Sequence, residues 1–398
     1  MPELTLAPND ILPEDGLVGT LVGRAWVPGD PGGPSPVLLT EDGVFDLSES
    51  EPLLARLLDS ESPAEVARQA AKSYVGAVAE VLANSRHDRR DPSQPWFLAP
   101  ADLQALKACG VTFVRSMLER VIEEQAKGSP ERAADIRRAI SAEIGDSLAD
   151  IVPGSDGATR VKAVLQERGL WSQYLEVGIG PDAEIFTKSQ PMSAVGVGAE
   201  IGIHPKSNWN NPEPEVVLAI DPRGRIVGAT LGNDVNLRDF EGRSALLLSK
   251  AKDNRGSCAI GPFIRLFDDS FTLDDVRRLE LGMRVVGDDG FVLEGASSMA
   301  EISRDVQDLA AQALGANNQY PDGLLLFTGT MFAPIEDRDA PGQGFTHHLG
   351  DSVAISTPRL GTLVNRVNHS SAIPPWRFGL GALIDNLARR GLLRGDDR

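Results

Sequence analysis

The 398-residue sequence predicts an α+β protein that is rich in β-structure. After Gly180 the chain consists of short β-type runs separated by glycine, whereas helical periodicity appears in segments before it. The chain also has no βαβ alternation, no G-x-G-x-x-G loop after a strand and no P-loop. These absences argue against a nucleotide-binding, doubly wound fold.

The N-terminal part begins with a small β element. Residues 19–47 alternate in the manner of strands, and the stretch PGDPGGPSP, residues 28–36, predicts a turn-rich loop between them. Ser62 followed by Pro63 is typical of a helix start, because proline fits the first helical position. We expect this helix to run to about Asn84.

A polar stretch, HDRRDPSQP at residues 87–95, separates the N-terminal part from the rest of the chain. We therefore predict a small α/β domain over residues 1–90 and a larger domain over residues 91–398. The larger domain is expected to begin with a helical hairpin over residues 113–150. Gly128 would end its first helix, and a Ser-Pro-Glu sequence would open the second.

The β-type runs of the larger domain have the spacing of a β-rich core with many turns. The turn sequence at residues 221–224 predicts that the second and third runs pair as a hairpin. The runs are AVGVGAEIGI, EVVLAID, RIVGATLG, LLLFTGT, SVAISTP and TLVNRV.

Composition excludes several classes of function. The chain has 39 basic and 57 acidic residues, a net charge of −18, which would repel a nucleic-acid backbone. Cys109 and Cys258 give neither a disulfide framework nor a zinc-ligand spacing, and we expect both to be buried thiols. No run approaches the roughly 20 apolar residues of a membrane span. The acidic, proline-containing N-terminus does not resemble a secretion signal. We expect a cytoplasmic protein without nucleic-acid or membrane partners.

The densest cluster of polar residues precedes the most apolar run. Glu213 and Glu215 are two residues apart, so both carboxylates would lie on one face of a strand. Asp234 would approach them if the two runs pair as a hairpin. Three converging carboxylates cannot all stay ionised without a cation, and an oxygen-only set suits Mg²⁺, Mn²⁺ or Ca²⁺ better than zinc. From spacing alone, these residues can equally be solvated acids at a strand edge.

Several segments together resemble the fumarylacetoacetate hydrolase family. EPEVVLAID, GNDVNLRD and KDNRGSCAIGPF are similar, in order and spacing, to its Glu-x-Glu, Asn-Asp-Val-Ser-x-Arg-Asp and Lys…Gly-Pro elements. EIFTKSQP resembles its Phe-x-Lys-Pro stretch with the proline displaced by two residues, and FTGTMFAP and GDSVAIS resemble its Thr-Gly-Thr and Gly-Asp elements. The likeness runs from about residue 108 to 370. It implies the mixed β-sheet roll of this family.

The resemblance assigns roles to individual residues. Lys252 stands at the position of the family's lysine, nine residues before Gly261, and it would orient or deprotonate substrate or water. The alternative is a surface lysine in a polar loop. Lys188 and Thr330 would border the pocket and contact substrate oxygens, although both can instead be structural. The metal-binding carboxylates implied by the resemblance are those of Glu213, Glu215 and Asp234.

The chain departs from the family pattern at one informative place. Hydrolytic members carry a Tyr-x-x-His-x-x-Glu stretch whose His–Glu pair activates water. This chain has Phe113, Ser116 and Glu119 there, and serine has no useful basicity at neutral pH. Glu119 can still act as an acid or base, or it can be a surface residue that pairs with Arg115. Arg115 and Ser116 are further candidates for substrate binding.

Within the family, the N-terminal extension, the helical hairpin and the runs WSQYLEVGIGPDAEIFTK and SNWNNPEPE look closest to dehydratases of 2-keto-3-deoxy sugar acids. This implies Mg²⁺-dependent dehydration of 2-keto-3-deoxy-D-arabinonate (equivalently D-xylonate) to 2-oxoglutarate semialdehyde in pentose catabolism. Glu119 and Lys252 would be the acid and base, in either order. A homodimer or homotetramer is expected.

Two other functions stay open. A hydrolase could cleave a C–C bond of an acylpyruvate-type β-diketo acid at the same metal site. It would need a base, which the glycine-rich loop with His347 and His348 supplies if that loop folds over the site. The other alternative is a non-catalytic binding protein that the metal stabilises.

Overall fold

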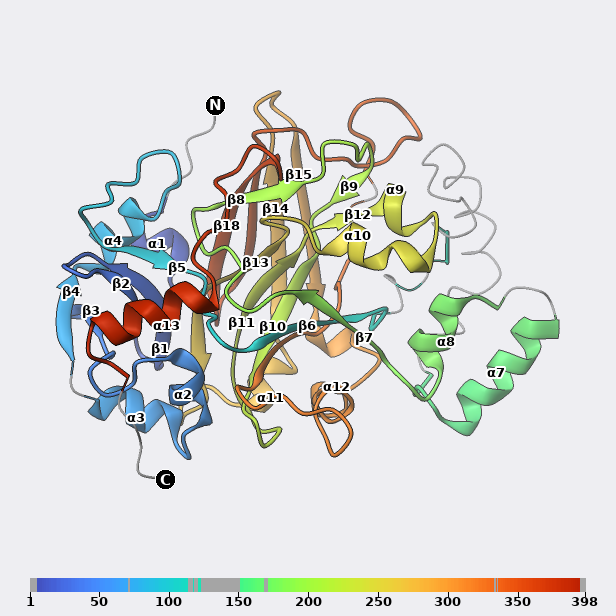
Figure 1. Cartoon of the computed structure of the whole chain (residues 1–398). Coiled ribbons are helices and arrows are strands. Elements are labelled where there is room, and N and C mark those ends of the chain that lie inside the picture. The colour runs from blue at the N-terminus through green and yellow to red at the C-terminus, as the bar shows by residue number, and fades with distance from the viewer. Residues whose placement is uncertain are drawn as a thin grey trace.

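The computed structural model describes residues 6–70, 72–113, 117, 121–122, 151–167, 171–332, 334 and 336–393. These residues form an 11-stranded sheet, a five-stranded sheet and a separate pair of two-residue strands, with helices around them (Figure 1). The predicted α+β, β-rich class is confirmed. The expected helical hairpin at residues 113–150 lies almost entirely outside the described residues.

The large sheet is antiparallel except for one parallel pair, β16 with β6. Strands from both sides of the predicted boundary near residue 90 belong to it, and the division into two domains stays a prediction. In spatial order its strands are β4 (Ser73–Gly76), β3 (Gly43–Asp46), β2 (Gly33–Thr40), β1 (Leu21–Val27), β13 (Cys258–Leu266), β11 (Ile226–Asp234), β10 (Pro214–Ile220), β16 (Leu324–Phe327), β6 (Ala105–Gly110) and β7 (Glu184–Ser189), and β5 (Trp96–Leu98) pairs with β1.

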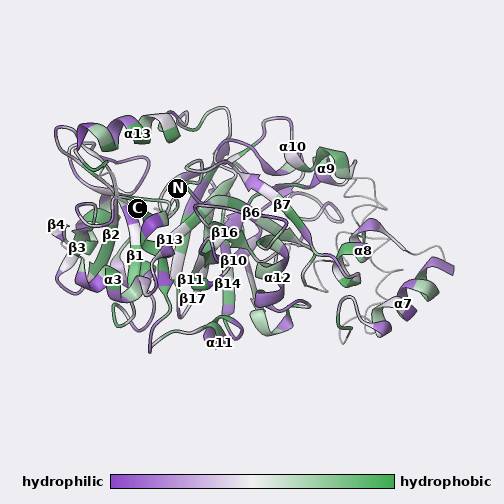
Figure 2. Cartoon of the chain, turned by 60° about the horizontal axis from the view of Figure 1, so that its bottom comes forward, coloured by the Kyte–Doolittle hydropathy of each residue, from purple (hydrophilic) through white to green (hydrophobic). Residues whose placement is uncertain are grey.

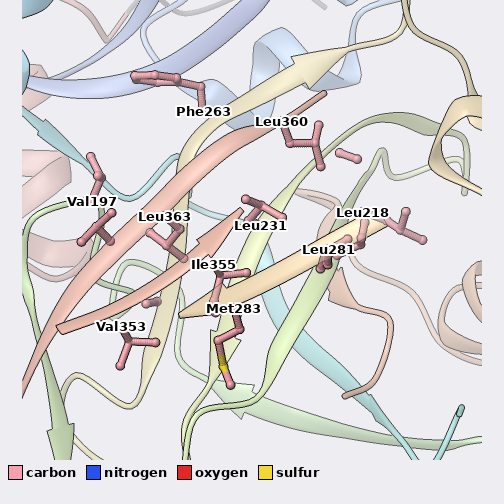
Figure 3. Packing of buried hydrophobic residues seen from close by; sticks show 14 of the residues in the cluster. Val197, Leu218, Leu231, Phe263, Leu281, Met283, Val353, Ile355, Leu360 and Leu363 are labelled. Atoms are coloured by element: carbon pink, nitrogen blue, oxygen red, sulfur yellow. The ribbon is translucent and has the colours of Figure 1, made fainter. Parts of the chain in front are cut away.

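The five-stranded sheet packs against the large one through a shared hydrophobic core. Leu218 and Leu231 of the large sheet belong to the same buried cluster as Met283, Ile355 and Leu363 of the smaller sheet (Figure 3). In order, the smaller sheet contains β15 (Val292–Ser298), β14 (Glu280–Val286), β17 (Ser352–Thr357), β18 (Gly361–His369) and β8 (Glu200–Ile203).

Strand β10 is covered on both faces, which explains why its sequence is continuously apolar. Leu218 points into the core between the sheets, whereas Val217 and Ala219 belong to a second cluster that includes Leu54 and Leu57 of helix α2 (Leu54–Asp59). A strand buried on both faces has no polar side to alternate with. The acids at its start therefore lie at the edge of a thoroughly apolar region.

The helices lie around the sheets, and Figure 2 shows both hydrophilic and hydrophobic residues on α7 and α13. Helix α13 lies against the N-terminal strands, where the Asn386 amide donates to the Gly32 carbonyl at 2.8 Å. The described α-helices are α1 (Pro8–Ile11), α2 (Leu54–Asp59), α3 (Pro63–Gln69), α4 (Val78–Asn84), α7 (Asp156–Glu167), α8 (Gln173–Ile179), α9 (Arg238–Glu241), α10 (Leu248–Lys252), α11 (Leu273–Val276), α12 (Val306–Ala313) and α13 (Leu380–Arg389).

The prediction of one helix from Ser62 to about Asn84 is wrong in its middle. The helix starts at Pro63 as predicted, but it ends at Gln69. Residues Ser73–Gly76 then form strand β4, which pairs with β3 at the sheet edge, before helix α4 begins. The tyrosine and valine of this segment favour a strand, and the free edge of β3 supplies the pairing partner.

The loop predicted at residues 28–36 is shorter than expected. Strand β2 begins at Gly33, which pairs with Val27 of β1. Pro34 and Pro36 are tolerated because β3 pairs only with the later part of β2, from Val37 onward. At Pro34 and Pro36, the side of β2 that would need backbone N–H donors therefore has no strand partner.

The hairpin predicted at residues 221–224 is confirmed and sets the geometry of the site. Strands β10 and β11 pair antiparallel, with Pro214 opposite Asn233. The Asp221 carboxylate closes the turn by accepting backbone N–H groups of Arg223 and Arg225, both at 2.9 Å. This register brings the start of β10 beside the end of β11.

Both cysteines are buried thiols, as predicted. Cys109 and Cys258 are free, and burial raises the pKa of the Cys258 thiol to about 12. Among the described residues, none of the helices has the length and apolar character required to cross a membrane.

Replacing Leu231 with alanine tests whether the two sheets share one core. Leu231 is fully buried between them, so we expect Leu231→Ala to lower the free energy of unfolding by about 2–5 kcal/mol in urea denaturation. Leu246→Ala is the control, since that side chain is 94% exposed and its loss should change stability by less than about 0.5 kcal/mol. Equal effects of the two substitutions would contradict the assignment of the core.

Candidate metal centre

Three acidic side chains from the β10–β11 hairpin converge on one point. Glu213, Glu215 and Asp234 each offer a carboxylate oxygen, and these oxygens lie within 4.8 Å of one another. All three residues are buried. The Asp234 backbone N–H donates to the Glu213 carbonyl at 3.0 Å, so the antiparallel register itself brings these two residues face to face.

The turn after β16 holds the carboxylate of Glu215. The Gly329 backbone N–H donates to Glu215 Oε2 at 2.7 Å, and Thr330 Oγ1 donates to Oε1 at 3.2 Å. Gly329 has φ +102°, and a Cβ there would lie 2.0 Å from Thr112 Oγ1. Only glycine fits this conformation and this space, which explains the residue in the Thr-Gly-Thr sequence.

Two buried lysines face the same acids. Lys252 Nζ lies 2.5 Å from Glu213 Oε2 and 2.8 Å from Asp234 Oδ2. Lys188 Nζ lies 2.9 Å from Asp234 Oδ1, and it also donates to the carbonyls of Lys252 and Val235. Lys252 is thus a buried residue of the site, not a surface lysine. The described contacts of Lys188 and Thr330 are with the acids and the backbone, and their binding of substrate stays a prediction.

The electrostatics of the cluster show an excess of negative charge. Three carboxylates face two ammonium groups, so these five groups carry one net negative charge when all are ionised. The pKa of Glu215 is raised well above its usual value, first because burial removes water and then because Asp234 and Glu213 repel its ionised form.

The donor set fits a hard divalent cation. All of the converging ligand atoms are carboxylate oxygens, which Mg²⁺, Mn²⁺ and Ca²⁺ prefer, and there is no cysteine or histidine among them. A cation would also offset the surplus negative charge. Glu213, Glu215 and Asp234 would hold it, with Lys188 and Lys252 fixing the orientation of Asp234.

Arg115, Ser116 and Glu119 lie outside the described residues. Their suggested roles, including Glu119 as an acid or base, stay predictions.

The loop with the two histidines forms a network of its own. His347 Nδ1 lies 3.2 Å from Asp351 Oδ2, which also pairs with Arg338 Nη1 at 2.6 Å. The His347 backbone N–H donates to Asn210 Oδ1 at 3.3 Å, which ties the loop to strand β9 (Asn210–Asn211). Burial raises the pKa of Asp351, but the bonds from Arg338 and His347 outweigh this and lower it to about 2. His348 is half exposed and faces Asp289 and Asp339.

Sequence reasoning missed two groups that position the acids. One is the Gly329 backbone N–H, which donates to Glu215. The only indication of it in the sequence is a glycine between two threonines. The other is Asn233, whose Oδ1 accepts the Glu213 backbone N–H at 3.0 Å and so links the two strands beside the acids. Its signal was an asparagine directly before Asp234.

Comparison with protein families identifies the region that contains this cluster. Residues 176–368 match the family described as fumarylacetoacetate (FAA) hydrolase C-terminal. These residues are an FAA hydrolase domain. The predicted resemblance is confirmed, and the matched segment contains all three acids and both buried lysines of the cluster.

Two curated relatives are 32% identical to this chain over part of their length. One is "2-dehydro-3-deoxy-D-arabinonate dehydratase" of Saccharolobus solfataricus, with 46% of this chain aligned to 58% of the relative. The other is "Probable 2-keto-3-deoxyxylonate dehydratase" of Haloferax volcanii, with 51% of this chain aligned to 66% of the relative. The chain thus matches less than two thirds of either relative.

Solved structures share the fold over a longer region. The apo form of 2-keto-3-deoxy-D-arabinonate dehydratase aligns with a TM-score of 0.60 and 20% identity, over 88% of this chain and 99% of that one. The form complexed with magnesium and 2,5-dioxopentanoate gives a TM-score of 0.58 and 19% identity, with the same coverage. These similarities establish the fold of the chain.

Removing the Lys252 ammonium should destabilise the protein. Lys252→Met removes the buried ammonium group that contacts both Glu213 and Asp234, so we expect the free energy of unfolding in urea at neutral pH to fall by about 3–5 kcal/mol. Lys250→Met is the matched control on the same helix, because Lys250 is exposed and should contribute less than about 0.5 kcal/mol. If both variants unfold at the same urea concentration, Lys252 does not stabilise the acids.

Proposed function

We propose that the chain is a Mg²⁺-dependent dehydratase that converts 2-keto-3-deoxy-D-arabinonate (D-xylonate) to 2-oxoglutarate semialdehyde (2,5-dioxopentanoate). The observation that carries this proposal is the buried Glu–Glu–Asp cluster. The names of both curated relatives support the substrate class. The solved relative complexed with magnesium and 2,5-dioxopentanoate supports the metal and the product.

The reaction is loss of one water from the sugar acid. A proton leaves C3 and the hydroxyl leaves C4, after which the C5 alcohol tautomerises to an aldehyde. A bound divalent cation supplies Lewis-acid polarisation of the 2-oxo group. No redox cofactor is required, because the oxidation level is only redistributed within the substrate.

The charges of the site suit this substrate. The five buried groups carry one surplus negative charge, which a divalent cation turns into one surplus positive charge. The carboxylate of a 2-oxo acid is attracted to this positive charge. Burial of the whole cluster makes this balance matter, since a net charge out of water is costly.

We assign the proton transfers to Glu119 and Lys252. Lys252 contacts Glu213 and Asp234 as a hydrogen-bond donor, which suits the acid that protonates the departing C4 hydroxyl. Glu119 is then the base that takes the C3 proton. Lys188 and Thr330 keep the acids oriented through Asp234 and Glu215.

The position of His347 favours dehydration over hydrolysis at the same centre. The His347 ring contacts the Asp351 carboxylate through Nδ1, and the His347 backbone N–H donates to Asn210. Among the described residues, no hydrogen bond or ion pair joins His347 to Glu213, Glu215 or Asp234. A hydrolase of β-diketo acids would lack this histidine as its base.

Incubation with synthetic 2-keto-3-deoxypentonate and Mg²⁺ tests the proposal directly. We expect the aldehyde product to form with Mg²⁺ and not with EDTA, and we expect Glu215→Gln to lower kcat/KM by at least about 100-fold because a ligand is lost. Glu294→Gln is the control, because its side chain is 71% exposed on the other sheet. Pyruvate and a second acid as products of the β-diketo acid would support the hydrolase instead. Mg²⁺-dependent stabilisation without turnover would support the binding protein.

Exchange of the C3 proton in deuterated water separates the two proton-transfer roles. Glu119→Gln should slow this exchange by about 10²–10⁴-fold, whereas Glu123→Gln, four residues later, should leave it unchanged. Nuclear magnetic resonance of the C3 position measures the rate. Full exchange and full turnover in Glu119→Gln would exclude this residue as the base.

A further inference from the structure

Next to the acids, two asparagines face each other with unsatisfied amide groups. Asn211 of β9 pairs with Asn236 of β12 (Asn236–Leu237), and both side chains are fully buried. Neither the nitrogen nor the oxygen of the Asn236 amide has a hydrogen-bond partner in the described structure, and the same holds for Asn211 Oδ1. The Asn211 nitrogen donates to the Pro212 carbonyl at 2.9 Å.

The strand register puts this pair beside the carboxylates. Asn236 is opposite Asn211, Asp234 bonds to Glu213 through the backbone, and Gly232 is opposite Glu215. The two strands thus stay in one register across Pro212, although the Glu213 backbone N–H donates to the Asn233 side chain and not to the facing backbone. Facing residues and every second residue share one face of a sheet, so the amides lie on the face that carries the acids.

A buried side-chain amide that only stabilises the fold forms hydrogen bonds with other groups of the protein. Here the unbonded groups are a donor and two acceptors, and all three belong to one facing pair of residues. A hydroxyl group is at once a donor and an acceptor, so it matches a carboxamide that offers both. The chemistry of the pair therefore suits a polyhydroxylated ligand.

We propose that Asn211 and Asn236 bind the C4 and C5 hydroxyls of the sugar acid and so determine its selection over simple 2-oxo acids. This inference rests on the proposed function. Two residues along a strand span about 6.6 Å. With C–C bonds of about 1.5 Å, C5 lies roughly 4 Å beyond C2. One hydrogen bond of about 2.8 Å closes the remaining distance. A substrate whose 2-oxo group lies at the acids thus reaches the amides with its far end.

The test compares two ligands on the same variants. The sugar acid 2-keto-3-deoxypentonate carries both hydroxyls, and pyruvate, which has the same 2-oxo acid end, carries neither. Binding of each is measured by calorimetry with Mg²⁺ present, and turnover of the sugar acid gives KM and kcat. The variants are Asn236→Ser, Asn236→Ala and Asn211→Ala. The control is Asn210→Ala, an equally buried neighbour whose amide holds His347.

We expect each variant of Asn211 or Asn236 to weaken binding of the sugar acid by about tenfold or more, the effect of losing a buried hydrogen bond. Pyruvate binding should change by less than twofold in the same variants, and Asn210→Ala should not alter the ratio of the two affinities. Three variants at two positions are compared, so if one of them misfolds, the other two still show whether the amides bind the hydroxyls.

Two results would overturn the inference. If the wild-type enzyme turns over the sugar acid but the variants weaken both ligands equally, the amides support the fold and not the hydroxyls, and the proposed function stands. If the wild-type protein neither binds nor converts the sugar acid, the proposed function fails and the inference fails with it.

Discussion

The structure of the site depends on one constraint, which is that three carboxylates are held out of water at the end of a hairpin. Glu213 and Asp234 face each other because the β10–β11 turn sets the register, and Glu215 follows on the same face. Their mutual repulsion has to be offset. Lys252 bridges Glu213 and Asp234, Lys188 holds the other oxygen of Asp234, and the Gly329 N–H and Thr330 hydroxyl bind Glu215.

The fold supplies the rigidity that such a cluster needs. Strand β10 is covered on both faces, by the second sheet and by the layer that contains α2. The acids at its start therefore cannot turn away to solvent without disturbing a large apolar core. Burying a carboxylate is costly unless it is paired, and a cluster of carboxylates with a perturbed pKa is typical of functional sites. The same burial strengthens the interactions of any charged group that enters the site.

The sequence predicts the hairpin and the acids well, because both depend on local pattern. Glu213 and Glu215 are two residues apart, and a turn sequence follows the apolar run at the right distance to return Asp234 to them. The helix expected to continue to Asn84 failed for a non-local reason. Ser73–Gly76 becomes a strand because β3 has a free edge, which no local pattern reveals. The start of β2 at Gly33 likewise depends on which of its sides is paired.

Within the site, the parts that could not be predicted are those that act across the fold. Gly329 is 114 residues from Glu215, and Lys188 is far in sequence from Asp234, so their contacts depend on the completed sheet. Asn211 and Asn236 belong to strands of two residues each, too short to leave a periodic signal. The family resemblance located Lys188 and Thr330 at the site, but their contacts with the acids emerge only from the folded chain.

Titration of the purified chain with Mg²⁺ by isothermal calorimetry measures directly whether the three buried carboxylates hold a cation. We expect saturable binding of one cation per chain, and we expect it to be abolished when Glu213 and Asp234 are both replaced by their amides. Absence of saturable binding in the wild-type protein, or equal binding by the double variant, would contradict this expectation.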